Sequence, residues 1–276
     1  MYFQRLITVL ALLAGTAFAD EDSRLEYLAN EGVAIFHGDS TIVFDPLFRN
    51  DYDAYHLVPE STRNAMFLGL EPFQNITEIF VSHHHGDHFD PADMLRLMAK
   101  HESAILYAPS QAISAMQLLA SDDQKGIFDR AIALDLTYDD EPVLIRNDNI
   151  RIEAFFVPHS GWPTARTDVD NIAFRVAVDG LATVVHLGDA DPNIIHFKRH
   201  EEQWREASVD VALPPYWFFV SRDGNQILED VIRPDHSIGI HVPSSISRDK
   251  GIPPELREFD LFLEPGESRP LPNPPK

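Results

Sequence analysis

A cluster of metal-ligating side chains follows a short apolar run at residues 79–81. The cluster reads His83-His84-His85-Gly86-Asp87-His88. Successive strand residues point to opposite faces, so His83 and His85 project to the same side and can share one metal ion. His84 then points away, either to support the ligands or to face solvent.

The second half of the cluster can supply ligands for a second metal ion. Gly86 permits a tight reversal of the chain. That reversal would bring Asp87 and His88 to a position a few ångströms from the first pair. Taken alone, the cluster has another interpretation, a solvated polar loop that binds metal adventitiously.

Three more apolar strands end in residues that can bind metal. Residues 155–158 precede His159, residues 184–187 precede Gly188 and Asp189, and residues 238–240 precede His241. In α/β folds, residues at strand ends gather at one edge of the sheet, where the chemistry takes place. We therefore expect these strand ends to join the histidine cluster, which favours a built site over a polar loop.

The composition narrows the chemistry. Of 276 residues, 22 are Lys or Arg and 44 are Asp or Glu, so the formal charge is −22. Such an acidic surface repels phosphate backbones, and nucleic acid is not expected as a partner. The chain has no cysteine. His and carboxylate side chains are therefore the strong metal ligands available.

The N-terminus has the layout of a secretory signal peptide. Arg5 precedes an apolar run at residues 6–14, and an A-x-A cleavage motif ends at Ala19. That run is shorter than the roughly 20 residues that a membrane span needs. We expect residues 1–19 to be a signal peptide and residues 20–276 to be one domain, periplasmic or secreted and without integral membrane association after cleavage. The alternative is an uncleaved anchor.

Short β-branched or aromatic runs between turn signals predict strands along most of the chain. They cover residues 33–37, 41–44, 78–81, 104–107, 150–157, 171–178, 181–187, 209–213 and 237–241. Helical spacing predicts helices at residues 91–101, 110–120 and 225–232. Hairpins mixed with strand-helix-strand units indicate a layered α/β fold with helices covering packed sheets.

Three segments carry weaker patterns. Residues 45–75 are either a structured insertion over a site or a loop. Asp179-Gly180 lies between paired runs and could close a hairpin. Residues 265–276, which have four prolines among the last seven residues, are expected to be frayed.

These motifs resemble the metallo-β-lactamase superfamily, over a span from Val33 to His241. The family motif H-x-H-x-D-H appears as His83, His85, Asp87 and His88, followed in order by His159, Gly188-Asp189 and His241. The resemblance implies a four-layer αββα sandwich with a dinuclear site along one edge. It also implies that one metal is held by His83, His85 and His159, the other by Asp87, His88 and His241, and that Asp189 bridges them.

Finer features separate branches of the superfamily. Residues 32–40 and Asp45-Pro46 resemble the lactonase-like branch, similar to ascorbate-phosphate lactonases. Diiron redox members usually replace the second histidine of the motif with Glu, whereas this chain keeps His85. Authentic β-lactamases generally lack the bridging carboxylate, whereas this chain has Asp189.

The resemblance implies a dinuclear metal-dependent hydrolase of a small-molecule ester or lactone, with a phosphodiester next. Two divalent ions are expected, Zn²⁺ first and Mn²⁺ or Fe as alternatives. A metal-bridging hydroxide would attack, and Asp87 would accept a hydrogen bond from it and return the proton to the leaving group. The alternatives are an iron-dependent redox enzyme of the same superfamily and a non-catalytic metal-binding module.

Some residues outside the cluster have two interpretations each. Trp162, Arg166 and Arg222 could bind substrate or could serve packing and surface ion pairs. His186 is expected to be buried and hydrogen-bonded rather than an extra ligand. His236 is expected at the surface, with a proton shuttle as the alternative. The acidic surface favours a neutral or weakly charged substrate.

The cleavage motif makes a prediction that can be checked directly. Exported protein should begin at Asp20, because signal peptidase cleaves after a small-residue motif such as the one that ends at Ala19. N-terminal sequencing or intact mass of the exported protein measures this. Protein that keeps Arg5 and stays with the membrane fraction would show that the segment is an anchor.

Overall fold

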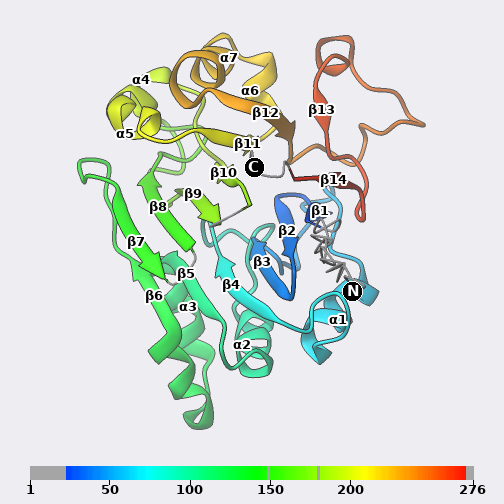
Figure 1. The fold of residues 1–276 in the computed structure, drawn as a ribbon, viewed down its shortest axis with the longest axis vertical. Helices are drawn as coiled ribbons and strands as arrows, with labels where there is room; N and C mark the ends of the chain where they lie inside the picture. The colour runs from blue at the N-terminus through cyan, green and yellow to red at the C-terminus, as the bar shows by residue number, and fades with distance from the viewer. Residues whose placement is uncertain (1–22, 148–149, 179–180, 272–276) are drawn as a thin grey trace, which may run out of the picture.

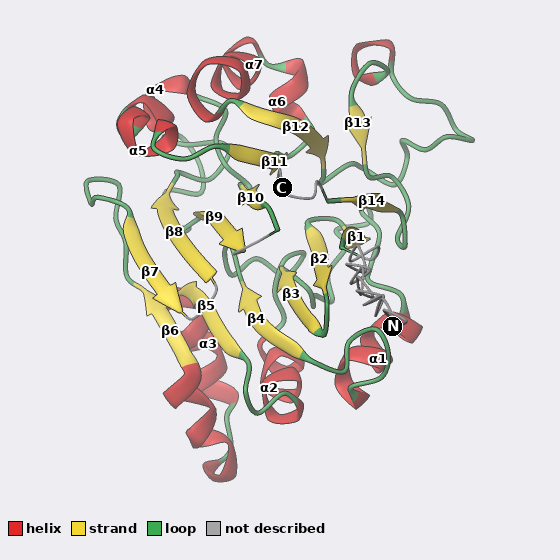
Figure 2. Cartoon of the chain, viewed as in Figure 1, coloured by secondary structure: helices red, strands yellow, loops and turns green. Residues whose placement is uncertain are grey.

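The computed structural model describes residues 23–147, 150–178 and 181–271. The predicted signal peptide and the Asp179-Gly180 turn lie outside these residues. Two mixed sheets pack face to face, and helices cover the outer face of each sheet (Figures 1 and 2). The four-layer α/β sandwich predicted from the sequence is therefore confirmed.

The first sheet has seven strands within the described residues, in the order β14-β1-β2-β3-β4-β5-β6. Their bounds are β1 Arg24–Ala29, β2 Gly32–His37, β3 Ser40–Phe44, β4 Ile76–Phe80, β5 Ile105–Pro109, β6 Ala131–Leu134 and β14 Ser268–Pro270. The strands from β14 to β3 pair antiparallel, and those from β3 to β6 pair parallel. On β2, Val33 and Ile35 pack between the sheets while Ala34 and Phe36 pack under the helices. Both faces of the sheet are thus apolar.

The second sheet also has seven strands in the described part of the chain, in the order β13-β12-β11-β10-β9-β8-β7. Their bounds are β7 Val143–Asn147, β8 Ile150–Phe156, β9 Ile172–Val178, β10 Thr183–His186, β11 Val209–Leu213, β12 Pro234–Gly239 and β13 Asp260–Leu261. The strands from β7 to β10 pair antiparallel, and those from β10 to β13 pair parallel. Phe174 and Val176 of β9 pack between the two sheets.

The helices form the two outer layers. The first sheet is covered by α1 Glu60–Leu68, α2 Pro91–Lys100, α3 Ser110–Leu119 and a 3₁₀ helix at Asp122–Arg130. The second is covered by α4 Ile194–Lys198, α5 Glu201–Arg205, α6 Trp217–Val220, α7 Arg222–Gln226, a π-helical turn at Ile227–Ile232 and a 3₁₀ helix at Pro254–Leu256. Among the described residues, none of the helices is long and apolar enough to cross a membrane.

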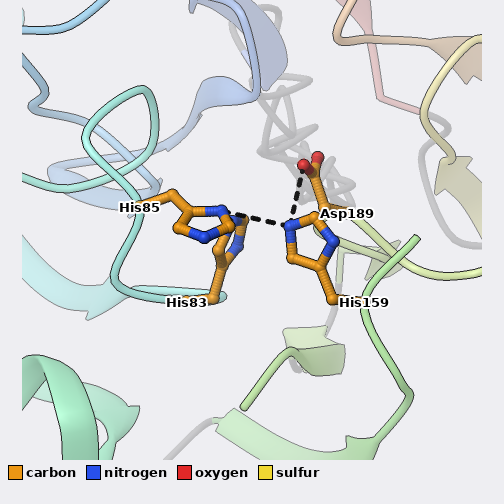
Figure 3. Close-up of side chains that lie close together, drawn as sticks. All are labelled: His83, His85, His159 and Asp189. Atoms are coloured by element: carbon orange, nitrogen blue, oxygen red, sulfur yellow. Dashed lines mark hydrogen bonds and ion pairs between the residues drawn. The ribbon is translucent and has the colours of Figure 1, made fainter. Parts of the chain in front are cut away.

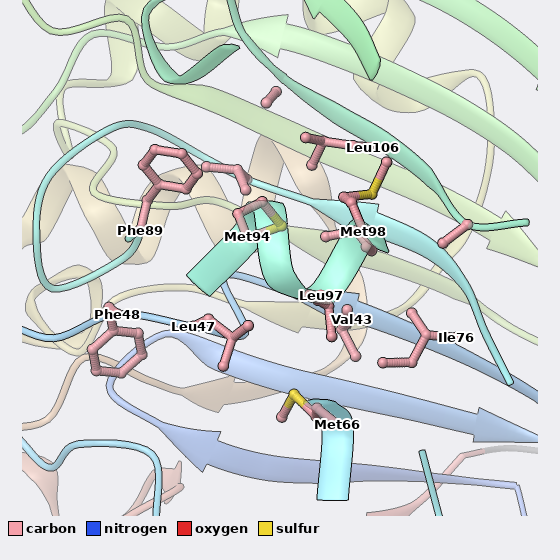
Figure 4. Packing of buried hydrophobic residues seen from close by; sticks show 14 of the residues in the cluster. Val43, Leu47, Phe48, Met66, Ile76, Phe89, Met94, Leu97, Met98 and Leu106 are labelled. Carbon is pink, nitrogen blue, oxygen red and sulfur yellow. The ribbon is translucent and has the colours of Figure 1, made fainter. Parts of the chain in front are cut away.

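Helix α2 begins directly after the loop that carries the histidine cluster. Its N-cap is Asp90, whose side chain accepts a hydrogen bond from the backbone of Asp93, and Pro91 occupies the first turn. Figure 4 shows Met94, Leu97 and Met98 of this helix packed against the buried core. The predicted helix with its apolar stripe is confirmed, and it fixes the loop that precedes it.

Three sequence expectations need correction or completion. Residues 265–276 are not frayed throughout, because β14 pairs with β1 and an edge strand can accommodate a proline such as Pro270. The helix expected at 225–232 begins earlier, as α7, and continues as the π-helical turn. Residues 45–75 contain α1, whose periodicity is too weak to predict it.

Candidate metal centre

The predicted ligands gather at one edge of the sandwich because the strands that carry them end there. Backbone hydrogen bonds tie the two sheets together at this edge. The amide of Ile172 donates to the carbonyl of Ser82 at 2.9 Å, and the amide of His241 donates to the carbonyl of Asn30 at 2.9 Å. Residues far apart in the sequence are thereby held side by side.

Four side chains form what we call the first donor group, which consists of His83, His85, His159 and Asp189. The Nδ1 atom of His85 lies 3.1 Å from Nε2 of His83 and 3.1 Å from Nε2 of His159. Nε2 of His159 lies 3.2 Å from a carboxylate oxygen of Asp189. Figure 3 shows these side chains pointing toward one another. Their ligand atoms surround one point, as metal coordination requires.

Three more side chains form the second donor group, which consists of Asp87, His88 and His241. The Oδ2 atom of Asp87 lies 3.4 Å from Nε2 of His241 and 3.7 Å from Nε2 of His88. Within the described residues, neither of these nitrogen atoms has a well-formed hydrogen bond, although both are buried. Buried imidazole nitrogens of this kind are suited to bind a cation.

The carboxylate of Asp189 lies between the two donor groups. One oxygen contacts His159, and the other lies 3.3 Å from Nε2 of His88 and 3.1 Å from Nε2 of His241. A single carboxylate that faces both groups can bridge two ions. The structure therefore brings all seven predicted ligands together at this edge, in two groups. Their roles as ligands stay a prediction.

Hydrogen bonds behind the ligands orient the imidazoles. Nδ1 of His83 lies 3.0 Å from the hydroxyl of Ser82, and that hydroxyl donates to the buried carboxylate of Asp45. Nδ1 of His88 lies 2.9 Å from the same carboxylate. With Nδ1 occupied as a donor, each ring directs its Nε2 atom toward the centre. The sequence prediction assigned no role at the site to Asp45 or Ser82.

The turn between β1 and β2 supports the second donor group. The side-chain amide of Asn30 donates to the backbone carbonyl of Asp87 at 2.9 Å and lies 3.4 Å from its carboxylate. Its neighbour Glu31 is fully buried, and neither of its carboxylate oxygens has a hydrogen-bond partner among the described residues. Oε2 of Glu31 lies 3.9 Å from Nδ1 of His88. The roles of Asn30 and Glu31 could not be predicted from the sequence, because neither residue is part of a motif with a recognisable spacing.

A cavity of about 310 Å³ opens over the donor groups, and we call it the metal cavity. It is lined by Tyr52, Ala54, Tyr55, His85, Asp87, Arg166, Asp189 and His241. The ring of Tyr55 packs edge-on against His241, with 4.3 Å between centroids. Of the two interpretations of segment 45–75, the insertion over a site therefore describes residues 52–55.

A sequence model of the family described as "Beta-lactamase superfamily domain" matches residues 40–223, which is more than half of the 276 residues. The chain belongs to this superfamily. The match covers the first donor group and two members of the second, and only His241 lies beyond it. No curated protein matches the chain.

Several solved structures that are named as hydrolases or phosphatases have a similar fold. A metallo hydrolase from the archaeon Ignicoccus hospitalis is 16% identical with a TM-score of 0.59, and the match covers 90% of this chain and 97% of that one. An isothiocyanate hydrolase from Delia radicum gut bacteria is 13% identical with a TM-score of 0.57, covering 89% and 98%. A diphosphatase of the PhnP family is 13% identical with a TM-score of 0.52, covering 91% and 99%. None of these singles out the lactonase-like branch.

In the protein without metal, His83, His85 and Asp189 of the first donor group are held in the protonation states that bind metal. Burial, together with the neighbouring His159, lowers the pKa of His85 to about 4. Burial and the charge of His88 hold the pKa of His83 well below its ordinary value. Burial would raise the pKa of Asp189, but the charges of His241 and His88 outweigh it and keep that pKa well below normal. These imidazoles are therefore neutral and this carboxylate is ionised near neutral pH.

The second donor group differs in one respect. Burial would lower the pKa of His88, but the carboxylates of Asp189 and Asp87 outweigh it and raise that pKa well above its ordinary value. A metal ion must displace this proton to bind Nε2. Burial would raise the pKa of Asp87, but the charge of His88 and the neighbouring imidazole of His241 outweigh it, so that pKa is lowered.

The donor set fits a divalent metal. The two groups offer imidazole nitrogen and carboxylate oxygen without sulfur, and their atoms lie within 4.8 Å of one another in each group. Such mixed sets bind Zn²⁺, Mn²⁺ or Fe²⁺. The structure therefore supports a metal site at this edge, while the roles of the individual ligands stay a prediction.

Other candidate residues fall outside the donor groups. His84 belongs to neither group. His186 is buried, and its Nε2 lies 2.9 Å from the backbone carbonyl of Glu31, as expected for a hydrogen-bonded core histidine. His236 lies at the surface and pairs with Asp260 at 3.0 Å. Arg222 begins α7 and does not line the metal cavity.

The proton on His88 predicts how pH affects metal binding. In metal-free protein, ring resonances of His85 should stay unchanged between about pH 5 and pH 8, because its pKa of about 4 leaves it neutral there. His88 should remain protonated at neutral pH. Metal binding through His88 should therefore strengthen as pH rises, with release of its proton, whereas the protonation of His83 and His85 should not limit binding over this range. Histidine NMR and potentiometric metal titration measure both, and a His85 that titrates near pH 6.5 would contradict the prediction.

Gly188 directly precedes Asp189, and a substitution at Gly188 tests how closely the end of β10 is packed. Its φ is +55°, and a Cβ there would lie 2.4 Å from the Asn171 side-chain oxygen that accepts the backbone N–H of Asp189. Gly188→Ala should lower the free energy of unfolding by at least about 2 kcal/mol, through strain and overpacking. Urea unfolding measures it.

Gly38→Ala is the matched control for that substitution. Gly38 has a φ of +54°, but a Cβ added there would have no other atom within 4 Å. Its substitution isolates backbone strain, so we expect a loss of only about 1 kcal/mol. Equal losses in the two variants would show that close packing at Gly188 does not matter.

Proposed function

We propose that the chain is a dinuclear metal-dependent hydrolase of small-molecule esters or lactones. The observation that carries the proposal is the position of the Asp189 carboxylate, which faces both donor groups. Two adjacent ions joined by one carboxylate are the usual arrangement in two-metal hydrolysis. The family membership and the metal-hydrolase neighbours support the class of reaction.

Charge balance supports two ions rather than one. Four carboxylates are buried at this edge, belonging to Glu31, Asp45, Asp87 and Asp189. When ionised, they carry a total charge that two divalent cations would neutralise, and buried charge without compensation is unfavourable. Burial raises the pKa of Glu31 well above its ordinary value, as expected for a carboxyl that lacks this compensation in metal-free protein.

Two divalent ions, when bound, would make a hydroxide from water near neutral pH and polarise the carbonyl oxygen of the substrate. The chain then has to orient the substrate and handle protons. Asp87 lines the metal cavity, and Asn30 holds its backbone and carboxylate in place. Its lowered pKa keeps it ionised, so its carboxylate can accept a hydrogen bond from the attacking hydroxide and pass that proton to the leaving group.

Tyr55 can assist as a hydrogen-bond donor. It lines the metal cavity beside His241. Burial, then the charges of Asp189 and Asp87, raise the pKa of the Tyr55 hydroxyl well above its ordinary value. The hydroxyl therefore stays protonated and can donate to the oxygen of the substrate on which negative charge develops.

Zn²⁺ is the proposed native metal, since imidazole predominates in both donor groups. The same site could hold iron. The β-hydroxylase CmlA, which is named as a diiron enzyme, is among the structures similar in fold, at 14% identity and a TM-score of 0.54. Retention of His85 at the second motif position favours hydrolysis over redox chemistry. We also propose that the protein is exported by its N-terminal leader and acts on a small molecule outside the cytoplasm.

Metal analysis and turnover test this proposal. Purified protein reconstituted with Zn²⁺ should hold about two ions per chain and hydrolyse members of an ester, lactone and phosphodiester panel. Asp189→Ala should lose metal and lower kcat/KM by at least about a hundredfold, because it removes the bridge.

His84→Ala is the control, since His84 is next to the ligands in sequence but belongs to neither donor group. It should retain metal and most of the activity. Equal losses in the two variants would contradict the ligand assignment. Fewer than one ion per chain would contradict the dinuclear site, and oxygen consumption by iron-loaded protein without hydrolysis would favour the redox alternative.

A further inference from the structure

A second cavity adjoins the metal centre, and we call it the side cavity. It has a volume of about 240 Å³, and its walls include Tyr138, Phe156, Trp162 and Val169. His159 also lines it, so the imidazole that belongs to the first donor group forms part of the wall. A substrate bound at the metal centre could therefore extend into this space.

The aromatic wall of the side cavity is held rigidly. The rings of Tyr138 and Trp162 stack with 5.6 Å between centroids, and the Tyr138 hydroxyl lies 3.0 Å from Nδ1 of His196. The guanidinium of Arg199 covers the Tyr138 ring at 4.1 Å. A preformed flat surface binds flat apolar groups at little entropic cost.

Arg166 lies where the two cavities meet, because it lines both of them. It is the only Lys or Arg among the lining residues of either cavity in the described part of the chain. Its Nη1 donates to the carbonyl of Ser160 at 3.3 Å, and within the described residues it forms no ion pair. Its φ of +55° is strained for a residue with a side chain. Arg166 is exposed, so its guanidinium can reach a substrate bound at the junction.

The distribution of charge separates two parts of this surface. Asp170 lines the side cavity but not the metal cavity, whereas Arg166 lines both. An anionic group is thus favoured beside Arg166 at the junction and disfavoured beside Asp170 in the side cavity. The acidic net charge of −22 favours a neutral substrate, but the local cation governs the contact once the substrate has docked.

We propose that the side cavity and Arg166 form a specificity subsite for substrates that carry an oxyanion near the scissile bond and a flat, apolar group beyond it. The oxyanion, a carboxylate or a phosphate, binds Arg166, and the flat group stacks against Trp162. The inference rests on the proposed hydrolase function for the presence of a scissile bond, but the binding itself is measured without turnover.

Three small probes separate the two contacts. Phenylacetate carries both the ring and the carboxylate, 2-phenylacetamide keeps the ring without the charge, and acetate keeps the charge without the ring. Their affinities for the Zn²⁺-loaded full chain are measured by calorimetry. Phenyl phosphate in place of phenylacetate then distinguishes phosphate from carboxylate recognition.

Arg166→Ala should weaken phenylacetate by at least about tenfold, the typical value of a charge-assisted hydrogen bond. It should change 2-phenylacetamide by less than about twofold. Arg222→Ala makes the same change of charge on α7, away from both cavities, and should leave every affinity unchanged. An unchanged affinity for phenylacetate and phenyl phosphate in Arg166→Ala would show that the oxyanions bind through the metals alone, and would overturn the proposal.

Trp162→Ala should weaken phenylacetate and 2-phenylacetamide by about fivefold or more while leaving acetate unchanged, and Trp162→Phe should restore most of the loss. Equal effects on acetate would mean that the variant disturbs the metal centre and would count against the subsite. Hydrolysis without any dependence on Arg166 or Trp162 would overturn the subsite and leave the hydrolase assignment intact. Binding that depends on both residues, without turnover of any ester or lactone, would support the subsite and contradict the hydrolase assignment.

Discussion

The carboxylate of Asp189 is the contact on which both halves of the candidate site depend. It lies within 3.3 Å of imidazoles that come from both sheets, namely His88, His159 and His241. Its position follows from the turn after β10, where Gly188 adopts a φ of +55°. Because the same carboxylate faces both donor groups, a displacement of this turn would disturb the two groups together. The donor groups are therefore one structural unit.

The site is assembled from strained strand ends rather than from regular structure. Asp45 has a φ of +40° and His241 a φ of +58°, values that residues with side chains seldom adopt. The sandwich that carries these turns is buried on both faces of each sheet. A stiff scaffold of this kind can hold several unfavourable conformations at once, which is how functional sites commonly keep their geometry.

The ligands could be predicted from the sequence better than their surroundings. Ligand positions follow spacing rules, since alternate strand residues share a face and strand ends meet at one edge. Asn30 and Glu31 escaped prediction because their roles depend on tertiary contacts with the β4–α2 loop and with His241. Helix α1 was not predicted, because only two of its residues, Met66 and Phe67, are buried and its apolar stripe is therefore weak. The strands β13 and β14 are too short for a periodic signal.

The pairing of β14 with β1 joins the two ends of the described chain, so the first sheet is complete only after the last strand has been synthesised. Arg24, at the start of the described chain, pairs with Pro270 near its end. The turn that follows β1 contacts His241 through Asn30 and His186 through Glu31. Contacts of such long sequence separation form late and slowly. The edge that gathers the donor groups therefore cannot close until His241, the last donor along the chain, has emerged from the ribosome.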